Sequence, residues 1–521
     1  MNNSNNIFQQ KRILIAVVLS FLFFIVYDYF FIPKQAIKLE QNITQKEPNT
    51  QAPNAKKLDI SSSNQVFKDI ISKVESEHFE AHIDSLGRIS AFFLKDKKYQ
   101  GENNVSINLI SKENSPYPLE LRFSDTNINA EAFKTPYSVS LKEAFVNENS
   151  SVSLSLKQEL NTLSVEKIIT FYPKGNYDIE VRLSKDSPYY ISTGFRPNVA
   201  VDTYTIHGVL LVDKNDKIQT FEDGDMQKEE NVNDVVIASA FDRYYASFFY
   251  NFEKPLNISI SKDTNDNPLL FAYSENFFKA GAYIGAKEHI ILRQIDERLN
   301  SVVEYGWFTF IAKPMYEFLD FLHKYIGNWG WAIVLMTLIV RIILFPLTYK
   351  SMISMNKLKD LAPKMKELRE RYKGEPQKMN MHMMELYKKH GANPMSGCLP
   401  ILLQIPIFFA IYRVLLNAVE LKGAPWALWI GDLSNLDPYY VLPILMGATM
   451  FLQQLITPVA IQDPTQAKIM KFLPVVFTFF FLWFPAGLTL YWFINNICSL
   501  IQQWIINKIF AKEHHKKQME Q

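Results

Sequence analysis

An arginine within an apolar run is the feature that most constrains how this chain folds. The run from Asn328 to Tyr349 is long enough to cross a bilayer as one helix, and Arg341 lies inside it. An arginine at mid-membrane costs about 3 kcal/mol, so such a charge usually faces protein or trapped water and serves a function. Thr337 lies one turn earlier on the same helical face and extends it into a polar stripe. Alternatively, the Arg341 side chain extends toward the cytosolic interface, about 12 Å away.

The overall composition conceals further membrane segments. Hydrophobic residues make up 48% of the chain and the net charge is +2, values that suit a soluble protein, but the apolar residues are concentrated in separate runs. The first run follows Lys11 and Arg12 and ends without a small-residue cleavage site, which indicates an uncleaved anchor rather than a signal peptide. The sequence therefore predicts six membrane-spanning helices: Ile13–Ile32, Asn328–Tyr349, Pro400–Val419, Val441–Ile461, Phe472–Phe484 and Leu488–Ile506.

The placement of lysine and arginine predicts the orientation of these helices. Residues 350–399 carry eleven basic residues, and residues 462–471 and the C-terminal tail are also basic. The loop of residues 420–440 has one lysine beside three acidic residues. Because basic loops stay in the cytosol, we expect a multi-pass inner-membrane protein with both termini cytoplasmic. The region between the first two spans is then periplasmic.

This exported region divides into a linker and a folded domain. Residues 33–77 are rich in Asn, Gln, Ser, Lys and Pro, a composition typical of a flexible linker. From residue 78 to residue 305 apolar residues alternate with polar ones, as at Val152, Leu154 and Leu156, and turn signals recur. This pattern predicts one large periplasmic β-sandwich domain.

The exported domain shows no pattern typical of an enzyme. His78 and His82 are assigned to the outer face of a strand, because Phe79, Ala81 and Ile83 alternate with them as its buried side. Carboxylate pairs of the glycosidase kind stay an open alternative, since their separation depends on the tertiary structure. The chain has no nucleophile motif, phosphate loop or metal-ligand spacing, so we expect no catalytic residue, no metal and no cofactor.

Two amphipathic segments flank the span that contains Arg341. Residues 306–327 predict a helix along the outer membrane surface or, alternatively, a helix that packs on the sandwich. Residues 350–395 predict a cytosolic helical hairpin whose basic surface is solvated, touches anionic lipid headgroups or binds a specific partner. Its apolar seam comprises Leu358, Leu361, Met365 and Leu368.

Long motifs in the C-terminal half resemble the YidC membrane-protein insertases. The resemblance covers essentially the whole chain, and a large periplasmic domain after an N-terminal span is similar to the Gram-negative form. The motifs are Pro394–Phe408 (PMSGCLPILLQIPIF), Ala424–Gly447 and Phe481–Trp492 (FLWFPAGLTLYW). The resemblance implies a five-helix insertase core at residues 328–508, including the hairpin, after an N-terminal anchor at residues 1–32 and before a basic cytosolic tail at residues 509–521.

The resemblance also implies a hydrophilic groove that is open to the cytosol and to lipid. Arg341 matches the groove arginine, and the other implied groove residues are Thr337, Gln404, Phe408, Phe484, Tyr491, Trp492 and Asn496. Trp492 stands where a second tyrosine is common in relatives, and Arg413 stands where a tyrosine is common. Arg413 either extends outward toward Glu420 or Asp432, or adds a second charge to the groove.

The implied function is insertion of nascent inner-membrane proteins, which enter the groove and release their hydrophobic segments sideways into the bilayer. The implied partners are nascent membrane proteins, the ribosome, the Sec translocon and membrane lipids, with no small-molecule substrate. A role as a chaperone in membrane-protein folding is also implied.

Two other classes of protein fit the sequence less well. An ion-coupled transporter would carry an acidic partner within its spans, and an anchored carbohydrate-processing enzyme would leave the five-span core without a role.

Overall fold

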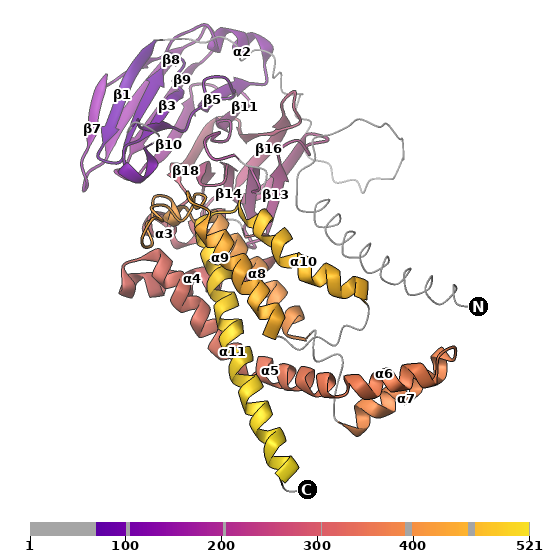
Figure 1. The fold of residues 1–521 in the computed structure, drawn as a ribbon. Helices are drawn as coiled ribbons and strands as arrows, with labels where there is room; N and C mark the ends of the chain where they lie inside the picture. Colours follow the sequence, from indigo (N-terminus) through magenta and orange to yellow (C-terminus); the bar gives the residue numbers. More distant parts are fainter. Residues whose placement is uncertain are drawn as a thin grey trace. The chain divides into compact units, whose positions relative to one another are not determined.

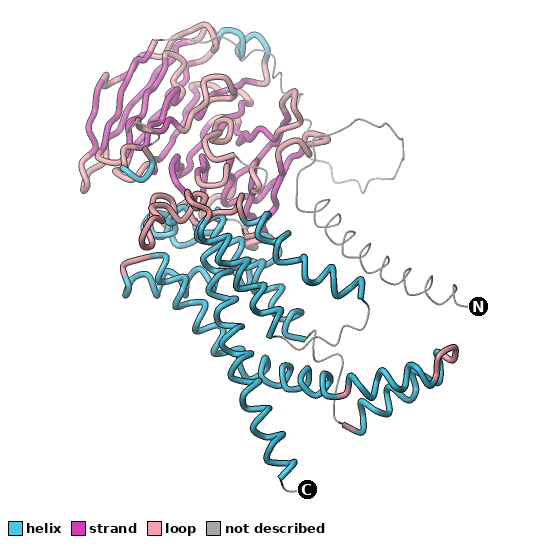
Figure 2. The backbone as a smooth tube through the Cα atoms, viewed as in Figure 1, coloured by secondary structure: helices cyan, strands magenta, loops and turns pink. Residues whose placement is uncertain are grey.

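The computed structural model describes residues 69–100, 105–201, 205–303, 305–390, 399–456 and 464–519. The chain divides into two compact units at the boundary between residues 303 and 304. The first unit consists mainly of strands and the second of helices (Figure 1 and Figure 2). The predicted N-terminal anchor and most of the predicted linker lie outside the described residues.

The first unit contains two β-sheets within its described residues. The smaller sheet has the order β4-β3-β2-β1-β7, in which only the β1–β7 pair is parallel. Its strands are β1 (Ile70–Ser76), β2 (Phe79–Asp84), β3 (Ile89–Leu94), β4 (Ile107–Asn108) and β7 (Glu143–Val146).

The larger sheet is antiparallel and runs in the order β5-β11-β17-β16-β14-β15-β18-β10-β9-β8-β6, with β12 and β13 attached through β14. Its strands are β5 (Pro118–Phe123), β6 (Ser138–Val139), β8 (Val152–Glu159), β9 (Ser164–Phe171), β10 (Asn176–Leu183), β11 (Tyr189–Thr193), β12 (Gly208–Asp213), β13 (Ile218–Glu222), β14 (Glu230–Phe241), β15 (Tyr245–Tyr250), β16 (Leu256–Lys262), β17 (Pro268–Ser274) and β18 (Phe277–Ala286). Short helices α2 (Thr126–Ala132) and α3 (His289–Ile295) complete the unit.

Period-two alternation builds the core between the sheets. Phe79, Ala81 and Ile83 of β2 are buried, as their alternation predicted. The ring of Phe79 lies 6.1 Å from that of Phe171 in β9, so the two sheets contact each other through their apolar faces. His82 lies on the other side of β2, where its Nε2 is 2.6 Å from a carboxylate oxygen of Glu80.

A lysine is completely enclosed in this core. The Nζ of Lys167 in β9 donates to the carbonyl oxygens of Gly87, at 3.0 Å, and Leu119, at 2.8 Å. Burial lowers the pKa of Lys167 to about 7, because no solvent stabilises its charged form. The side chain therefore joins a turn of the smaller sheet to the first strand of the larger one.

The second unit is helical, and its longest described elements are α5 and α11 (Figure 1). Helix α5 packs against α4 and α11, α8 packs against α4, and α9 packs between α10 and α11. The helices are α4 (Thr309–Ile326), α5 (Trp329–Asp360), α6 (Ala362–Arg371), α7 (Pro376–Lys389), α8 (Leu399–Asn417), α9 (Val441–Ile456), α10 (Pro464–Phe481) and α11 (Ala486–Met519).

Among the described residues, α5 is the one helix both long and apolar enough to cross a membrane. Shorter apolar stretches occur at Gln404–Asn417, Val441–Ile456 and Phe472–Phe481. Asn328 caps α5 by accepting a hydrogen bond from the backbone N–H of Trp331, at 3.0 Å. The helix does not end at Tyr349, where the apolar run stops, but continues to Asp360 at the base of the hairpin.

Helix α4 buries Ala312, Tyr316, Leu319 and Leu322, which repeat at helical spacing. This face packs against α5 and α8 of the same unit. Phe310 and Tyr325 lie outside this face and are 73% and 78% exposed.

The hairpin formed by α6 and α7 encloses a small core of its own. Leu358, Leu361 and Met365 are buried in it, and Met383 and Leu386 of α7 pack against them. Leu368 is only half-buried. The seam predicted from the sequence is therefore present, with its last member less enclosed than expected.

Candidate groove site

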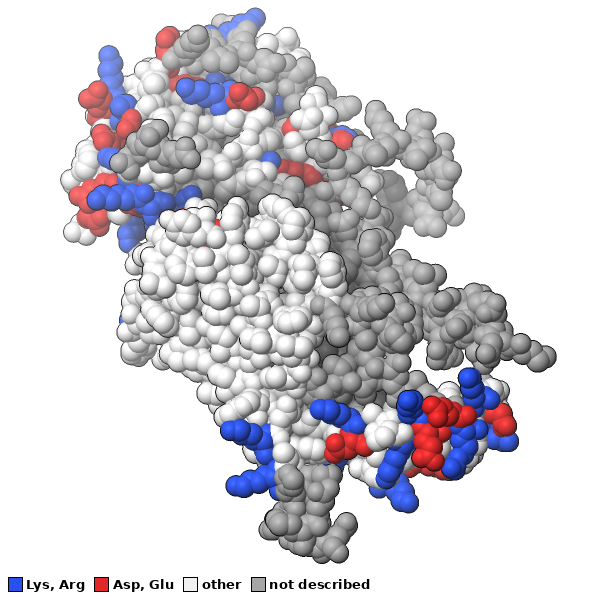
Figure 3. All heavy atoms as spheres, viewed as in Figure 1, with Lys and Arg blue, Asp and Glu red and all other residues white. Residues whose placement is uncertain are grey.

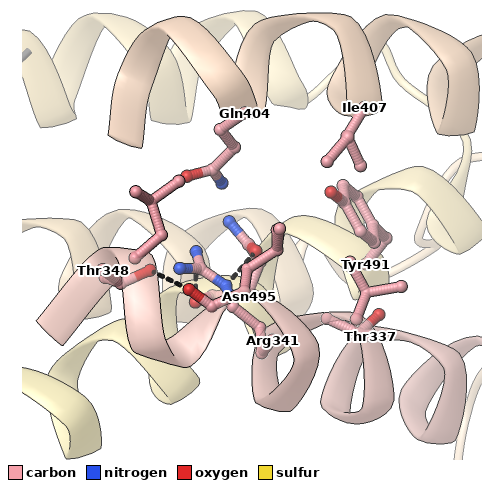
Figure 4. A pocket seen from close by; sticks show the side chains of 10 residues that line it. Thr337, Arg341, Thr348, Gln404, Ile407, Tyr491 and Asn495 are labelled. Carbon is pink, nitrogen blue, oxygen red and sulfur yellow. Dashed lines mark hydrogen bonds between the residues drawn. The ribbon is translucent and has the colours of Figure 1, made fainter. Parts of the chain in front are cut away.

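A small cavity of about 20 Å³ lies beside Arg341 in the helical unit. In Figure 4, Gln404 points from α8 toward the guanidinium of Arg341, which lies beside Asn495 of α11. The cavity is lined by Thr337, Val340, Arg341, Leu344, Leu347 and Thr348 of α5, Gln404 and Ile407 of α8, and Tyr491 and Asn495 of α11. Three helices that are distant in the sequence thus form one polar cavity with aliphatic walls.

Helical spacing explains which α5 residues face the cavity. Thr337, Arg341, Leu344 and Thr348 are separated by four, three and four positions, so they lie on one side of the helix. The hydroxyl of Thr337 donates to the backbone carbonyl of Ile333, at 2.7 Å, and the hydroxyl of Thr348 donates to that of Leu344, at 3.0 Å. Both threonine hydroxyls thus donate within α5. Arg341 is the charged side chain that lines the cavity.

Arg341 is held by a neutral residue. Its Nε donates to the side-chain oxygen of Asn495, at 2.7 Å, and its Nη2 donates to the backbone oxygen of the same residue, at 3.2 Å. No carboxylate of the described residues forms an ion pair with Arg341. Among the described residues, the guanidinium of Arg341 therefore has no oppositely charged partner beside the cavity.

Phe408, Phe484 and Trp492 form part of an aromatic cluster beside the cavity and do not line it. The rings of Phe408 and Trp492 meet edge to face, with centroids 4.6 Å apart, and Phe484 lies 5.2 Å from Phe481. The cluster comprises Phe408, Tyr412, Phe477, Phe481, Phe484 and Trp492. Phe408 lies one turn beyond Gln404 on α8, so the cluster adjoins the polar cavity.

Asn496, which the resemblance assigned to the groove, does not line the cavity beside Arg341. Its side chain is buried and donates to the backbone oxygen of Met446 in α9, at 3.4 Å. One residue along an α-helix rotates the side chain by about 100°, so Asn495 faces α5 when Asn496 faces α9. Sequence reasoning missed Asn495, although it lies four residues after Tyr491 and therefore on the same face of α11.

Arg413 is buried in α8 and also does not line the cavity. It lies nine residues after Gln404, and nine steps of about 100° put it on the opposite side of the helix. The predicted acceptors are engaged elsewhere: Glu420 accepts from the hydroxyl of Tyr316, at 2.7 Å, and Asp432 accepts from Ser434, at 2.8 Å. Arg413 is therefore not among the residues that line the cavity beside Arg341.

Sequence comparisons agree with this architecture in both units. Residues 321–514 match the family described as 60Kd inner membrane protein, and residues 72–318 match the YidC periplasmic domain. The membrane protein insertase YidC of Campylobacter jejuni is 74% identical over 524 residues, which cover 99% of each chain. The chain belongs to the YidC insertase family.

Further relatives of the YidC family match along nearly the whole chain. The membrane protein insertase YidC of Wolinella succinogenes is 50% identical, over 98% of this chain and 96% of its own. A solved structure described as an active YidC insertase with the first transmembrane domain resolved is 18% identical, with a TM-score of 0.38, and covers 94% of this chain and 98% of its own.

Family membership confirms the resemblance inferred from the sequence motifs. It also agrees with the predicted order of a β-rich domain, here of the YidC periplasmic family, followed by a helical C-terminal region. The cavity around Arg341 lies in the part of the chain that matches the inner-membrane protein family.

Proposed function

We propose that this protein inserts nascent inner-membrane proteins by admitting their polar segments to the cavity around Arg341. The family of membrane protein insertases supports the overall activity. The observation that supports this mechanism is the arginine beside the cavity: in the described part of the chain, its guanidinium donates only to neutral oxygens of Asn495. Such an arginine can attract an acidic segment of a client without first losing a carboxylate partner of its own.

The physical difficulty for a single-spanning client is the transfer of its polar terminus across a hydrocarbon layer of about 30 Å. Moving a polar or charged group out of water is costly unless partners replace the water. Arg341, Gln404 and Tyr491 provide such partners on three helices. The hydrophobic segment of the client then partitions sideways into lipid, and this step supplies the free energy without a nucleotide, a metal or a chemical reaction.

The proposed topology has six membrane spans, both termini in the cytoplasm and the β-rich unit in the periplasm of the inner membrane. The apolar helices of the second unit support it. On the face shown in Figure 3, the helical surface is almost free of charged side chains. Basic and acidic side chains both gather over the hairpin α6–α7, and Lys and Arg lie toward the C-terminal part of α11. This separation follows the rule that basic residues stay in the cytosol.

The hairpin and the C-terminal tail are the proposed contacts for the ribosome, and the Sec translocon is a proposed partner for complex clients. The basic surface of the hairpin, which includes Lys364, Lys366 and Lys388, supports the first proposal because RNA phosphates attract such groups. The stable hairpin core supports a role as a folded contact element.

Replacement of Arg341 tests the proposed mechanism. Arg341→Ala is expected to reduce insertion of clients with acidic N-terminal segments by about tenfold and to change that of neutral clients by less than about twofold, because only the acidic clients use the charge. Arg341→Lys is expected to retain most of the activity. The measurement is protease-protected insertion into proteoliposomes that contain each purified variant.

Arg413→Tyr is the matched control, since it removes an arginine on the far side of α8 and introduces the residue common in relatives. It is expected to leave the ratio of acidic to neutral client insertion unchanged. Equal loss of both client types in Arg341→Ala would show that Arg341 supports the fold rather than the passage of charge.

A further inference from the structure

Asn495 holds Arg341 through two different atoms of one residue. The side-chain oxygen accepts from Nε and the backbone oxygen accepts from Nη2, so two of the three guanidinium nitrogens are engaged on the same side. The third nitrogen, Nη1, has no hydrogen-bond partner among the described residues. The guanidinium therefore has one nitrogen available to a passing client or to water.

The amide of Asn495 has a defined orientation in this contact. Its oxygen must face Nε, because the alternative orientation would bring two N–H donors together. Ser499, one turn later on α11, donates to the backbone oxygen of Asn495, at 3.0 Å, and Gln502 donates to the backbone oxygen of Arg341, at 3.4 Å. The α11 face that carries Asn495 is thus bound to both the side chain and the backbone of Arg341.

From this geometry we infer that Asn495 is the residue that sets the preference of the groove for acidic clients. It positions the guanidinium of Arg341 with an acceptor that carries no charge. A carboxylate at the same place would form a charge-assisted, bidentate pair with the guanidinium and cancel its field in the cavity. The inference rests on the proposed function, because it assumes that clients pass beside Arg341.

The Nη1 donor of Arg341 indicates which chemical groups a preferred client carries. A single planar guanidinium held on one edge offers N–H groups to a carboxylate oxygen of an aspartate or glutamate in an extended segment. One contact of this kind, made in competition with water, attracts such a segment and still allows it to leave. The preferred clients therefore carry one or a few carboxylates ahead of their hydrophobic segment.

The test uses the ratio of acidic to neutral client insertion, because loss of folded protein lowers both and leaves the ratio unchanged. Asn495→Asp, which has nearly the same shape, is expected to reduce this ratio by about tenfold, as Arg341→Ala does. Asn495→Leu removes the side-chain acceptor without adding charge, and it is expected to reduce the ratio by about threefold because the guanidinium is no longer held in place. A client with a basic N-terminal segment is expected to insert better into Asn495→Asp than into the wild type.

Asn496→Leu is the matched control, since the neighbouring amide faces α9 and not the cavity. It is expected to leave the ratio unchanged even where total insertion falls. An unchanged ratio in both Asn495 variants, with a reduced ratio in Arg341→Ala, would overturn the role of Asn495 and leave the proposed function intact. An unchanged ratio in Arg341→Ala would overturn the proposed function itself, so the two failures are distinguishable.

Discussion

At the scale of single residues, Lys167 shows how the β-rich unit accommodates a buried amine. Two backbone carbonyls accept its N–H groups, and its Nζ lies 4.6 Å from the centroid of the Tyr137 ring. These neutral partners do not replace bulk water for a full charge, which is why the pKa falls to about 7. The protonation state of Lys167 therefore couples the stability of this unit to pH near neutrality.

We expect the unfolding free energy of the β-rich unit to rise with pH above about 7. Between about 7 and the ordinary value of 10.5, the unfolded chain binds a proton at Lys167 that the folded chain has released. The rise approaches about 1.4 kcal/mol per pH unit for a single group. Methionine cannot bind this proton, so the unfolding free energy of Lys167→Met should not show this rise. From pH 7 to pH 9 the wild type should therefore become more stable relative to the variant.

Native-state hydrogen exchange of the β9 amides in the full-length protein, corrected for the intrinsic exchange rate at each pH, measures this difference. Parallel pH profiles for wild type and Lys167→Met would show that Lys167 keeps its proton in the folded state.

At the scale of elements, the first turn of α5 packs closely against the loop before α9: the backbone at Gly330 lies against the indole ring of Trp426. Asn328 donates to the carbonyl oxygens of Pro425 and Trp426, both at 3.1 Å. A Cβ added at Gly330 would collide with the ring of Trp426. The absence of a side chain at Gly330 therefore lets the loop before α9 pack on the first turn of α5.

Gly330→Ala is expected to destabilise the helical unit by about 1–3 kcal/mol, because the Trp426 ring must move. Gly431→Ala is the control in the same loop, since a Cβ there meets no atom within 4 Å. Thermal unfolding followed by tryptophan fluorescence compares the two variants. Equal melting temperatures for both would contradict the packing described here.

The hairpin is a second element whose contribution can be isolated. Leu361 is 4% exposed in its core, and Met381 on α7 is 52% exposed. Leu361→Asp buries an unpaired charge and is expected to unfold the hairpin and reduce insertion of all clients severalfold, because such burial costs several kcal/mol. Met381→Asp adds the same charge at the surface and is expected to have little effect.

Limited proteolysis of the hairpin, measured together with insertion, tests this expectation. A Leu361→Asp variant with a protease-sensitive hairpin and normal insertion would remove the hairpin from the proposed mechanism.

At the scale of the whole molecule, the chain consists of two compact units, and the cavity around Arg341 is built entirely by the second. The β-rich unit has its own core and its own buried charges. Insertion as proposed needs the cavity and the hairpin, both of which lie after residue 303.

Deletion of residues 69–303 is therefore expected to lower insertion of single-spanning clients by less than about threefold, because the deleted unit supplies no residue to the cavity. The measurement is insertion into proteoliposomes, with Arg341→Ala in the full-length chain as the reference for reduced insertion of acidic clients. Complete loss of activity on deletion would instead favour a protein whose active part is the β-rich unit.

Local patterns in the sequence were sufficient for much of this architecture. Alternation with period two identified the buried side of β2 and the strand β8, because side chains on a strand alternate between faces. Spacing of three and four identified the hairpin core around Leu361, because that spacing defines one face of a helix. The cost of a charge in an apolar run singled out Arg341.

The tertiary structure alone decided what surrounds Arg341. Asn495 is 154 residues away in the sequence, and its contact with Arg341 depends on how α5 and α11 are rotated about their axes. Both Asn495 and Asn496 are polar residues on an apolar helix, and the spacing of four from Tyr491 selects Asn495 only once Tyr491 is known to face the cavity. A rotation of about 100° separates a residue that holds the arginine from one that faces α9, and only packing between the helices sets that rotation.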